Sequence, residues 1–263
     1  MRLPLRIPSI NPLVLLVVLH FAIPGKAQAV AANSCSLTDV QTAVNNAGRN
    51  GSVSVPAGSC SWSSPLNITT GITLTGAGAG STIITSSGGI TLITANPDAT
   101  AIANSESIKI TGFTFDGANS SGILIQIEGA NGTSGTKPYR YYIIGDNTFR
   151  NANPASAIGG TVGACIQSFP DSHGQLRGVI YHNTFDRCNI LLRVFSEDTT
   201  SEWSNTAFNQ LAYGTEDSLY FEDNTIQFSS SYNGSDPGWI ETGQRGRLVA
   251  RYNNYNFSNA ATP

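Results

Sequence analysis

Hydrophobic and polar residues alternate along much of the chain, and four alternating segments end at the same polar turn. In each segment a short strand-like run is followed by Asn147, Asn183, Asn224 or Asn253, and a fifth segment carries Phe113 in the Asn position. The intervals from Phe113 onward are 34, 36, 41 and 29 residues. Alternation with a period of two is typical of β-strands, and self-similarity at a period of about 20–50 residues indicates a solenoid.

A stack of coils explains this repeat in physical terms. Each strand would lie over the equivalent strand of the previous coil, with alternate side chains pointing inward. An Asn at one repeated turn position can bond the amide and main chain of the next coil, forming a ladder. Two residues after the Asn, Phe149, Phe185 and Ile226 would fill the interior. The pattern predicts an all-β fold, a right-handed parallel β-helix.

The first structured segment has a different pattern. Residues 36–44 read as a short amphipathic helix opened by a Ser or Thr cap, and alternating strands follow at 51–58 and 72–78. A helix over the open end of a solenoid protects its core and its unpaired edge. We therefore expect residues 36–44 to form an N-terminal capping helix.

The N-terminus has the pattern of a secretory signal peptide. Arg2 and Arg6 precede an eleven-residue apolar run (13–23), and Ala27-Gln28-Ala29 follows. The run falls short of the roughly 20 residues that span a bilayer, so no membrane span is expected. We expect a signal peptide over residues 1–29, cleaved near Ala29 or Ala31, and one β-helix domain over 30–263.

The far end of that domain carries no recognisable cap. The chain stops at Pro263 directly after a coil. Two explanations stay open: the natural protein continues beyond this point, or a partner covers the exposed coil. The second explanation includes end-to-end self-association through the uncapped coil.

Composition narrows the class of partner. Charged residues make up 12% of the chain, well below the roughly 25% of an ordinary globular domain. Without Arg2, Arg6 and Lys26, 11 of the 14 basic residues remain against 17 acidic ones, a net charge of −6. A nucleic-acid partner normally requires a basic face, so none is expected.

Four cysteines fit an oxidising compartment. Cys35 and Cys60 flank the first structured segment, while Cys165 and Cys188 lie 23 residues apart, about one coil. We expect these two pairs, although four cysteines allow three connectivities. Neither pair has the spacing of a zinc site, and no metal ligand is assigned.

Residues near the N-terminus carry a family resemblance. Asp39, Val55-Pro56-Ala57-Gly58 and Gly76-Ala77-Gly78, followed by the Asn-Thr-Phe coils, resemble the pectate-lyase-like superfamily of parallel β-helix repeat proteins. The resemblance covers roughly residues 35–260. It implies a polysaccharide in a groove along one parallel sheet, but the superfamily hosts many activities.

The best-known activities of that superfamily are disfavoured. The Trp-Ile-Asp-His and Arg-x-Pro-x-x-Arg signatures of pectate lyases are absent, as is the motif series of polygalacturonases. His173, in Asp171-Ser172-His173, faintly resembles an Asp-x-His motif of β-helix uronate epimerases. The resemblance therefore implies no assignable activity.

A second strand follows each Asn turn and supplies the main candidate surface. If Ile125, Ile166, Leu192 and Ile240 point inward, strand alternation places the next residue of each strand on one outward face. Those residues are Gln126, Gln167, Arg193 and Glu241. They are candidates to face a substrate, and the alternative is a solvated polar face with one cross-coil salt bridge.

These groups support two reaction types. β-Elimination of a uronic acid needs a base and a cation that neutralises the carboxylate, roles that Arg193 and Arg245 could fill, with Ca²⁺ as a further neutraliser. Glycoside hydrolysis needs two carboxylates at the scissile bond, and Glu241 with Asp217 or Asp198 would supply them.

Long inter-coil segments add candidate contacts. Residues 196–217 contain Glu197, Asp198, Trp203 and Asp217, and an aromatic ring beside acids suits a sugar platform. The alternative is that the acids are solvated and Trp203 anchors the loop. Arg247, close to Glu241, is a further candidate binding residue.

Together these patterns predict a secreted carbohydrate-active β-helix protein. It would bind or act on an extracellular, acidic polysaccharide, first as a lyase and second as a hydrolase. The alternative is a non-catalytic adhesin or a structural fibre subunit.

Overall fold

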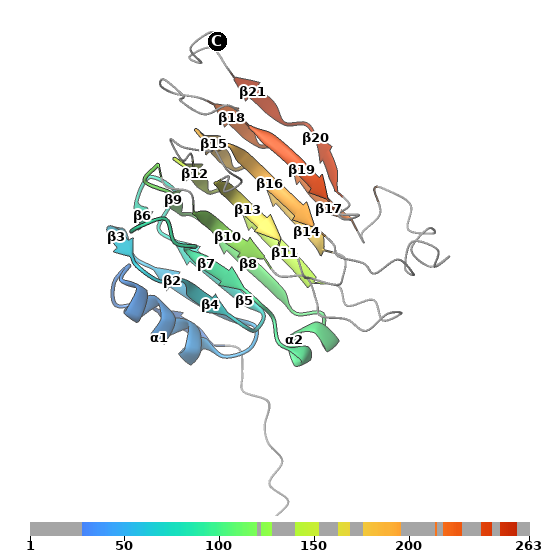
Figure 1. The fold of residues 1–263 in the computed structure, drawn as a ribbon. Coiled ribbons are helices and arrows are strands. Elements are labelled where there is room, and N and C mark those ends of the chain that lie inside the picture. Colours follow the sequence, from blue (N-terminus) through green and yellow to red (C-terminus); the bar gives the residue numbers. More distant parts are fainter. Residues whose placement is uncertain are drawn as a thin grey trace, which may run out of the picture.

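Three parallel β-sheets make up most of the molecule (Figure 1). The computed structural model describes residues 28–119, 122–127, 140–152, 163–168, 176–195, 214, 218–227, 238–243 and 248–256. Sheet A has eight strands, sheet B seven and sheet C six, and successive coils supply one strand to each sheet in turn. This confirms the predicted all-β parallel β-helix.

The strands of each sheet stack in chain order. Sheet A consists of β1 (Ala29–Ala31), β2 (Gly51–Val55), β5 (Ile72–Gly76), β8 (Ser107–Thr111), β11 (Arg140–Gly145), β14 (Leu176–Tyr181), β17 (Leu219–Glu222) and β20 (Val249–Arg251). Sheet B consists of β3 (Gly58–Trp62), β6 (Thr82–Ser86), β9 (Thr114–Asp116), β12 (Thr148–Arg150), β15 (Thr184–Asp186), β18 (Thr225–Gln227) and β21 (Asn254–Asn256). Sheet C consists of β4 (Leu66–Ile68), β7 (Ile93–Ala95), β10 (Ile123–Ile127), β13 (Ala164–Ser168), β16 (Ile190–Phe195) and β19 (Trp239–Gly243).

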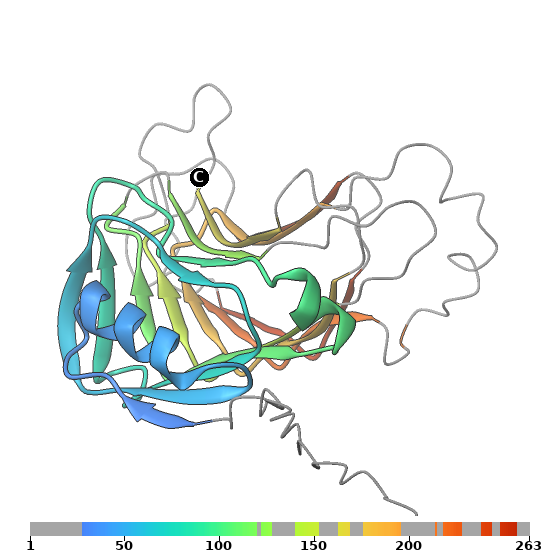
Figure 2. The ribbon, with the colours of Figure 1, turned by 90° about the horizontal axis from the view of Figure 1, so that it is seen from below.

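Helix α1 (Leu37–Ala47) caps the N-terminal end, as predicted. The Ser36 side chain accepts a hydrogen bond from the Asp39 backbone N–H, which satisfies one of the unpaired amides of the first turn. The apolar face of helix α1 is buried, and Figure 2 shows the helix lying across the end of the coil stack. The buried residues of that face are Val40, Ala43, Val44 and Ala47.

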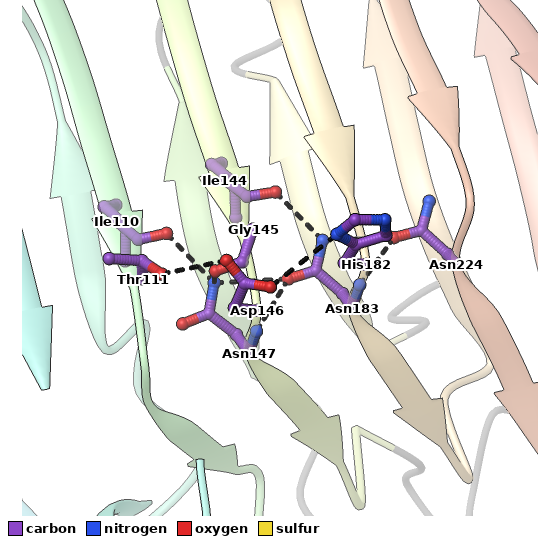
Figure 3. Close-up of polar contacts among 9 residues, drawn as sticks. All are labelled: Ile110, Thr111, Ile144, Gly145, Asp146, Asn147, His182, Asn183 and Asn224. Atoms are coloured by element: carbon purple, nitrogen blue, oxygen red, sulfur yellow. Dashed lines mark hydrogen bonds and ion pairs between the residues drawn. The ribbon is translucent and has the colours of Figure 1, made fainter. Parts of the chain in front are cut away.

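The predicted Asn ladder is present at the corner between sheets A and B (Figure 3). The backbone N–H and the Nδ2 of Asn147 both donate to Oδ1 of Asn183, at 3.1 and 3.2 Å. Asn183 bonds Asn224 in the same way, and Asn224 bonds Asn253. We call these four residues the ladder.

Each ladder residue also bonds the preceding coil. The Nδ2 of Asn183 donates to the carbonyl of Ile144 at 2.9 Å, and Asn147, Asn224 and Asn253 make the equivalent bond at 2.9–3.0 Å. The ladder ends at Phe113, whose backbone N–H donates to Oδ1 of Asn147. The side-chain amides of the buried ladder residues therefore find hydrogen-bond partners inside the protein, as buried polar groups generally do.

Aromatic rings stack in the interior beside the ladder. Phe115, Phe149 and Phe185 are fully buried, and their ring centroids lie 5.5 and 5.0 Å apart on successive coils. Ile226 continues the column and is also fully buried. The predicted interior residues are thus confirmed, and the stack fills the space between the sheets.

Two disulfides join the predicted pairs. Cys35 is bonded to Cys60, and Cys165 is bonded to Cys188. The first fixes the segment before α1 to β3, and the indole Nε1 of Trp62 donates to the Cys35 carbonyl at 3.0 Å. The second joins β13 to the turn before β16, so it connects adjacent coils. Both disulfides are consistent with an oxidising compartment.

Candidate functional site

One row of directly paired residues runs along the outer face of sheet C, although the pairing of β16 with β19 shifts by one residue between Ile190 and Leu192. Gln126 pairs with Gln167, Gln167 with Arg193, and Arg193 with Glu241. The row extends toward the N-terminal end through Thr94 and Asn67. We call these residues the outer row: Asn67, Thr94, Gln126, Gln167, Arg193 and Glu241.

The row lies on the outer side of sheet C, although alternation is interrupted beside it, where Leu124, Cys165 and Leu191 are fully buried like the residues that follow them. Ile125, Ile166 and Leu192 are fully buried, whereas Gln126 and Gln167, their neighbours in sequence, are half-buried. Every strand of sheet C contributes one member, so the row covers six coils. Adjacent strands lie about 4.8 Å apart, which gives one polar side chain per coil along the axis of the helix.

Arg193 lies at the centre of the polar contacts in the row. Its Nε donates to Oε2 of Glu241 at 2.8 Å, and its Nη1 donates to Oε1 of Gln167 at 3.4 Å. The Arg193 side chain is 17% exposed and that of Glu241 is 39% exposed. The cross-coil salt bridge considered as the alternative is therefore present. It holds both charges at fixed positions on a surface that solvent reaches.

This arrangement limits the chemistry that Arg193 can perform. A guanidinium stays protonated at neutral pH and presents a planar set of N–H donors to carboxylates. Arg193 is therefore suited to bind or neutralise an anionic group, and it is a poor base. Glu241 supplies the single carboxylate of the row, while the two glutamines offer amide donors and acceptors suited to hydroxyl groups.

Several predicted site residues lie outside the described part of the chain. They are His173, Glu197, Asp198, Trp203, Asp217, Arg245 and Arg247. Among the residues that the structure describes, no three His, Cys, Asp or Glu side chains converge as a metal site would require. No helix in the described ranges combines the length and apolar character needed to cross a membrane.

A second column lies beside the ladder, on the exposed corner between sheets A and B. Asp146, His182 and Asp223 each precede a ladder residue and adopt positive φ angles of 57°, 51° and 54°. Nδ1 of His182 lies 3.8 Å from Oδ1 of Asp146, and Thr111 Oγ1 donates to Oδ2 of Asp146 at 3.5 Å (Figure 3). Both side chains of the His–Asp pair are more than half exposed. This geometry is that of a surface turn with a long contact between two solvated side chains.

Comparisons with known proteins leave the family open. No protein-family model and no curated protein matches the chain. ORF18 of Geobacillus virus E2 shares 16% identity at a TM-score of 0.32, over 87% of this chain and 60% of that one. The PL6 family alginate lyase AlyGC shares 10% identity at a TM-score of 0.41, over 90% of this chain and 39% of that one. The chain spans less than two thirds of either protein, and likeness at these TM-scores carries no argument about function.

Sequence reasoning missed two members of the outer row. Thr94 and Asn67 lie on coils that precede the ladder, so no repeated Asn marked the register of their strands. The signal available was alternation alone, in Leu66-Asn67-Ile68 and Ile93-Thr94-Ala95.

Proposed function

We propose that this protein is secreted and binds an extracellular acidic polysaccharide along the outer row of sheet C. The observation that carries the proposal is the row itself, six register-matched polar side chains with Arg193 held between Gln167 and Glu241. A polymer lying along the axis of the helix would meet one polar group on each coil. Arg193 would pair with a carboxylate of the polymer, and the amides would bond its hydroxyls.

We further propose a lyase reaction at the charged end of the row. In β-elimination a base removes the C5 proton next to a uronate carboxylate, and a cation stabilises the enolate that forms. The C4–O bond to the neighbouring sugar then breaks, a C4=C5 double bond forms, and the leaving oxygen takes up a proton from an acid or from water. Arg193 fits the stabilising role, with Arg245 or a bound Ca²⁺ as its partner. His173 is the proposed base, and Trp203, Glu197, Asp198, Asp217 and Arg247 are the proposed further contacts.

Hydrolysis is the second reaction to consider. Inverting and retaining glycosidases both need a pair of carboxylates, one acting as an acid. Glu241 would be one of them, with Asp217 or Asp198 as the other.

A non-catalytic role is supported by the same contact. Because Arg193 is already bonded to Glu241 and Gln167, the three side chains make a cross-coil network that would stabilise a structural fibre or an adhesin. Exposed Trp239, on the end strand of sheet C, and exposed Tyr252 and Tyr255, on the last described coil, agree with end-to-end contact between copies. In either role, the two disulfides support export, with residues 1–29 as signal peptide and 30–263 as the domain.

An activity screen of the folded protein tests the proposal. Polygalacturonate, alginate and a neutral glucan would each be incubated with and without calcium, following both unsaturated-uronate absorbance and new reducing ends. Absorbance that disappears in Arg193→Gln identifies a lyase acting at the row. Reducing ends without absorbance identify a hydrolase. Binding without either product supports the adhesin role.

A matched variant controls for loss of an ion pair elsewhere. Arg150 on sheet B bonds Asp116 of the previous coil at 2.7 Å, the same kind of cross-coil contact as Arg193 with Glu241. Arg150→Gln should keep full binding and activity. Equal losses in both variants, or no binding of any acidic polysaccharide by the wild-type protein, would contradict the proposed function.

A further inference from the structure

The outer face of sheet A changes character halfway along the molecule. On β2, β5 and β8 the outward positions carry hydroxyl side chains with one lysine: Ser52, Ser54, Thr73, Thr75, Ser107, Lys109 and Thr111. On β11, β14, β17 and β20 they carry aromatic, aliphatic and Arg side chains. We call this second group the aromatic face: Tyr141, Ile143, Arg177, Val179, Tyr181, Tyr220, Glu222, Val249 and Arg251.

Outward positions of a strand are ordinarily polar, so this composition needs a cause. The inward partners in the same strands, such as Ile144, Ile180 and Phe221, already form the core and are fully buried. The aliphatic members Ile143, Val179 and Val249 share one register row with Tyr220 and are half-buried. Thr73 and Thr75, which carry the hydroxyl groups at outward positions of β5, are half-buried as well. Core packing therefore does not explain the apolar side chains of the aromatic face.

Cations lie beside the aromatic rings of this face. The guanidinium carbon of Arg177 is 5.5 Å from the centroid of the Tyr141 ring, and that of Arg251 is 4.6 Å from the centroid of Tyr220. Arg251 is also bonded to Glu222 at 2.6 Å. Cation–π contacts and this ion pair hold both guanidinium groups close to the rings. The face thus carries two positive charges and one negative charge on a chain whose formal net charge is −3.

Tyr181 completes the surface at the edge nearest the ladder. A Cβ atom at Gly145 would clash with the Tyr181 ring, so the ring lies over the Gly145 backbone of the previous coil. Burial, and to a smaller extent the charge of Asp146, raises the pKa of the Tyr181 hydroxyl, which keeps the phenol neutral. The result is a neutral ring packed on the sheet with its hydroxyl available as donor or acceptor.

The size of the face limits its occupant. Four strands about 4.8 Å apart and outward residues spanning about 13 Å give a footprint of about 200 Å². A stable protein interface needs about 800 Å² on each partner, so the face is too small for a stable dimer on its own. Flat aromatic and aliphatic groups match the apolar faces of sugar rings, and the Arg side chains match carboxylates.

We propose that the aromatic face is a second binding surface for an acidic polysaccharide, separate from the outer row of sheet C. This inference rests on the proposed function for the class of ligand. The face would hold the polymer while the row engages another segment of it, so the two surfaces raise the overall affinity for long chains through avidity. Short oligosaccharides, which cannot reach both surfaces, would show two independent and weaker sites.

Binding measurements on four variants test the inference. Affinity for long polygalacturonate and alginate would be measured by electrophoresis through gels that contain each polymer, with a neutral glucan gel as reference. The variants are Tyr181→Ala/Tyr220→Ala, Arg177→Gln, Arg193→Gln, and Thr73→Ala/Thr75→Ala as the matched control on the hydroxyl half of sheet A. We expect at least a tenfold loss of affinity for the tyrosine double variant, a smaller loss for Arg177→Gln, and none for the threonine control.

The outcomes separate this inference from the proposed function. Loss in Arg193→Gln together with wild-type affinity in both aromatic-face variants would overturn the inference and leave the outer row intact. Loss of affinity in the aromatic-face variants alone would support the inference and would exclude the outer row as a binding surface. A concentration-dependent dimer by light scattering that Arg177→Gln abolishes, without any change in polymer affinity, would assign the face to a second copy and overturn the inference. Thermal melting of each variant identifies a folding defect. If the tyrosine double variant does not fold, the affinity of Arg177→Gln decides the test of the aromatic face.

Discussion

The ladder and the outer row both run along the coils in register, and they differ in how their residues vary. The ladder repeats Asn at four successive turns, with each Oδ1 and Nδ2 bonded to a neighbouring coil. The outer row changes residue from coil to coil and faces outward on sheet C. One column is a repeated, internally satisfied structure, whereas the other is a sequence of different polar groups.

This difference assigns the two columns different roles: the ladder stabilises the fold, and the outer row is available to recognise a ligand. A repeated residue whose polar atoms are all bonded inside the protein has nothing left to offer a ligand, so its role is to hold the coils together. The outer row, whose side chains are only partly buried, is expected to contribute little to the stability of the fold, because ion pairs and amides that solvent reaches are also well solvated in the unfolded chain. Substitutions in the two columns should therefore act on different measurable properties.

The largest effect is expected in the middle of the ladder. Asn183→Ala leaves the backbone N–H of Asn147 and the Ile144 carbonyl without this partner, while Nδ2 of Asn147 keeps its bonds to the carbonyls of Ile110 and Gly145. Each buried group left unsatisfied costs about 1–3 kcal/mol, so the free energy of unfolding should fall by about 2–6 kcal/mol. Urea denaturation measures this free energy, and Thr184→Ala, a substitution at a neighbouring half-buried position, is the control. A loss below about 1 kcal/mol would show that the ladder is not what holds these coils together.

The second disulfide is expected to behave like the ladder. Replacing Cys165 and Cys188 by Ala removes a crosslink with a sequence separation of 23 residues, which should lower the free energy of unfolding by about 3 kcal/mol. Although Cys165 lies two residues before Gln167, the affinity for polysaccharide should stay unchanged. Thermal melting and gel affinity on the same preparation test both statements. Loss of binding at unchanged stability would break the proposed separation.

Arg193→Gln should show the opposite pattern. Because its partner Glu241 is 39% exposed and can be solvated, the loss of stability should stay within about 1 kcal/mol. Affinity for an acidic polysaccharide should fall at least tenfold and become less sensitive to salt, since a charge-assisted contact is lost. Gel affinity at two ionic strengths measures this change. A large drop in melting temperature with unchanged affinity would place Arg193 with the structural residues.

The smallest effect concerns an ion pair that belongs to neither column. Arg49 contacts Asp98 and Glu106, and the bond from Arg49 holds the pKa of Asp98 below its usual 3.8. A carboxyl whose pKa is lower in the folded state stabilises the protein above the unfolded pKa, and this contribution disappears as pH falls through the folded pKa. The difference in melting temperature between wild type and Arg49→Gln should therefore shrink as pH falls below about 4. A difference that stays constant between pH 6 and pH 3 would contradict this reading.

The parts of the fold that repeat were predictable from the sequence. Asn147, Asn183 and Asn224 stand in matching strand contexts, so the same register argument placed the ladder, the Phe stack and four members of the outer row. The two disulfides match the expected pairs, and for Cys165 and Cys188 the signal was a spacing of about one coil. Repetition converts a weak local pattern into a geometric prediction, since an error in one coil would conflict with the others.

The parts that occur once were not predictable in this way. The contacts of Arg49 with Asp98 and Glu106 join residues 49 and 57 positions apart, and nothing in the local pattern marks them. The aromatic face was open to the same alternation argument, through Tyr141 and Ile143 or Val179 and Tyr181. Alternation alone does not reveal it, because a strand with apolar side chains on both faces looks the same in sequence as a strand that is buried on both faces.

A charge-swapped pair tests the central claim most directly. The double variant Arg193→Glu/Glu241→Arg keeps a cross-coil ion pair in the outer row but moves the cation by one coil and reverses the order of the charges. Affinity for polygalacturonate and alginate would be measured for the wild type, the two single variants and the double variant, together with their melting temperatures. If the row recognises an acidic polymer, the double variant regains the wild-type melting temperature while its affinity stays at least tenfold weaker. Recovery of both stability and affinity would contradict the account, because it would show that the pair serves only to join the coils.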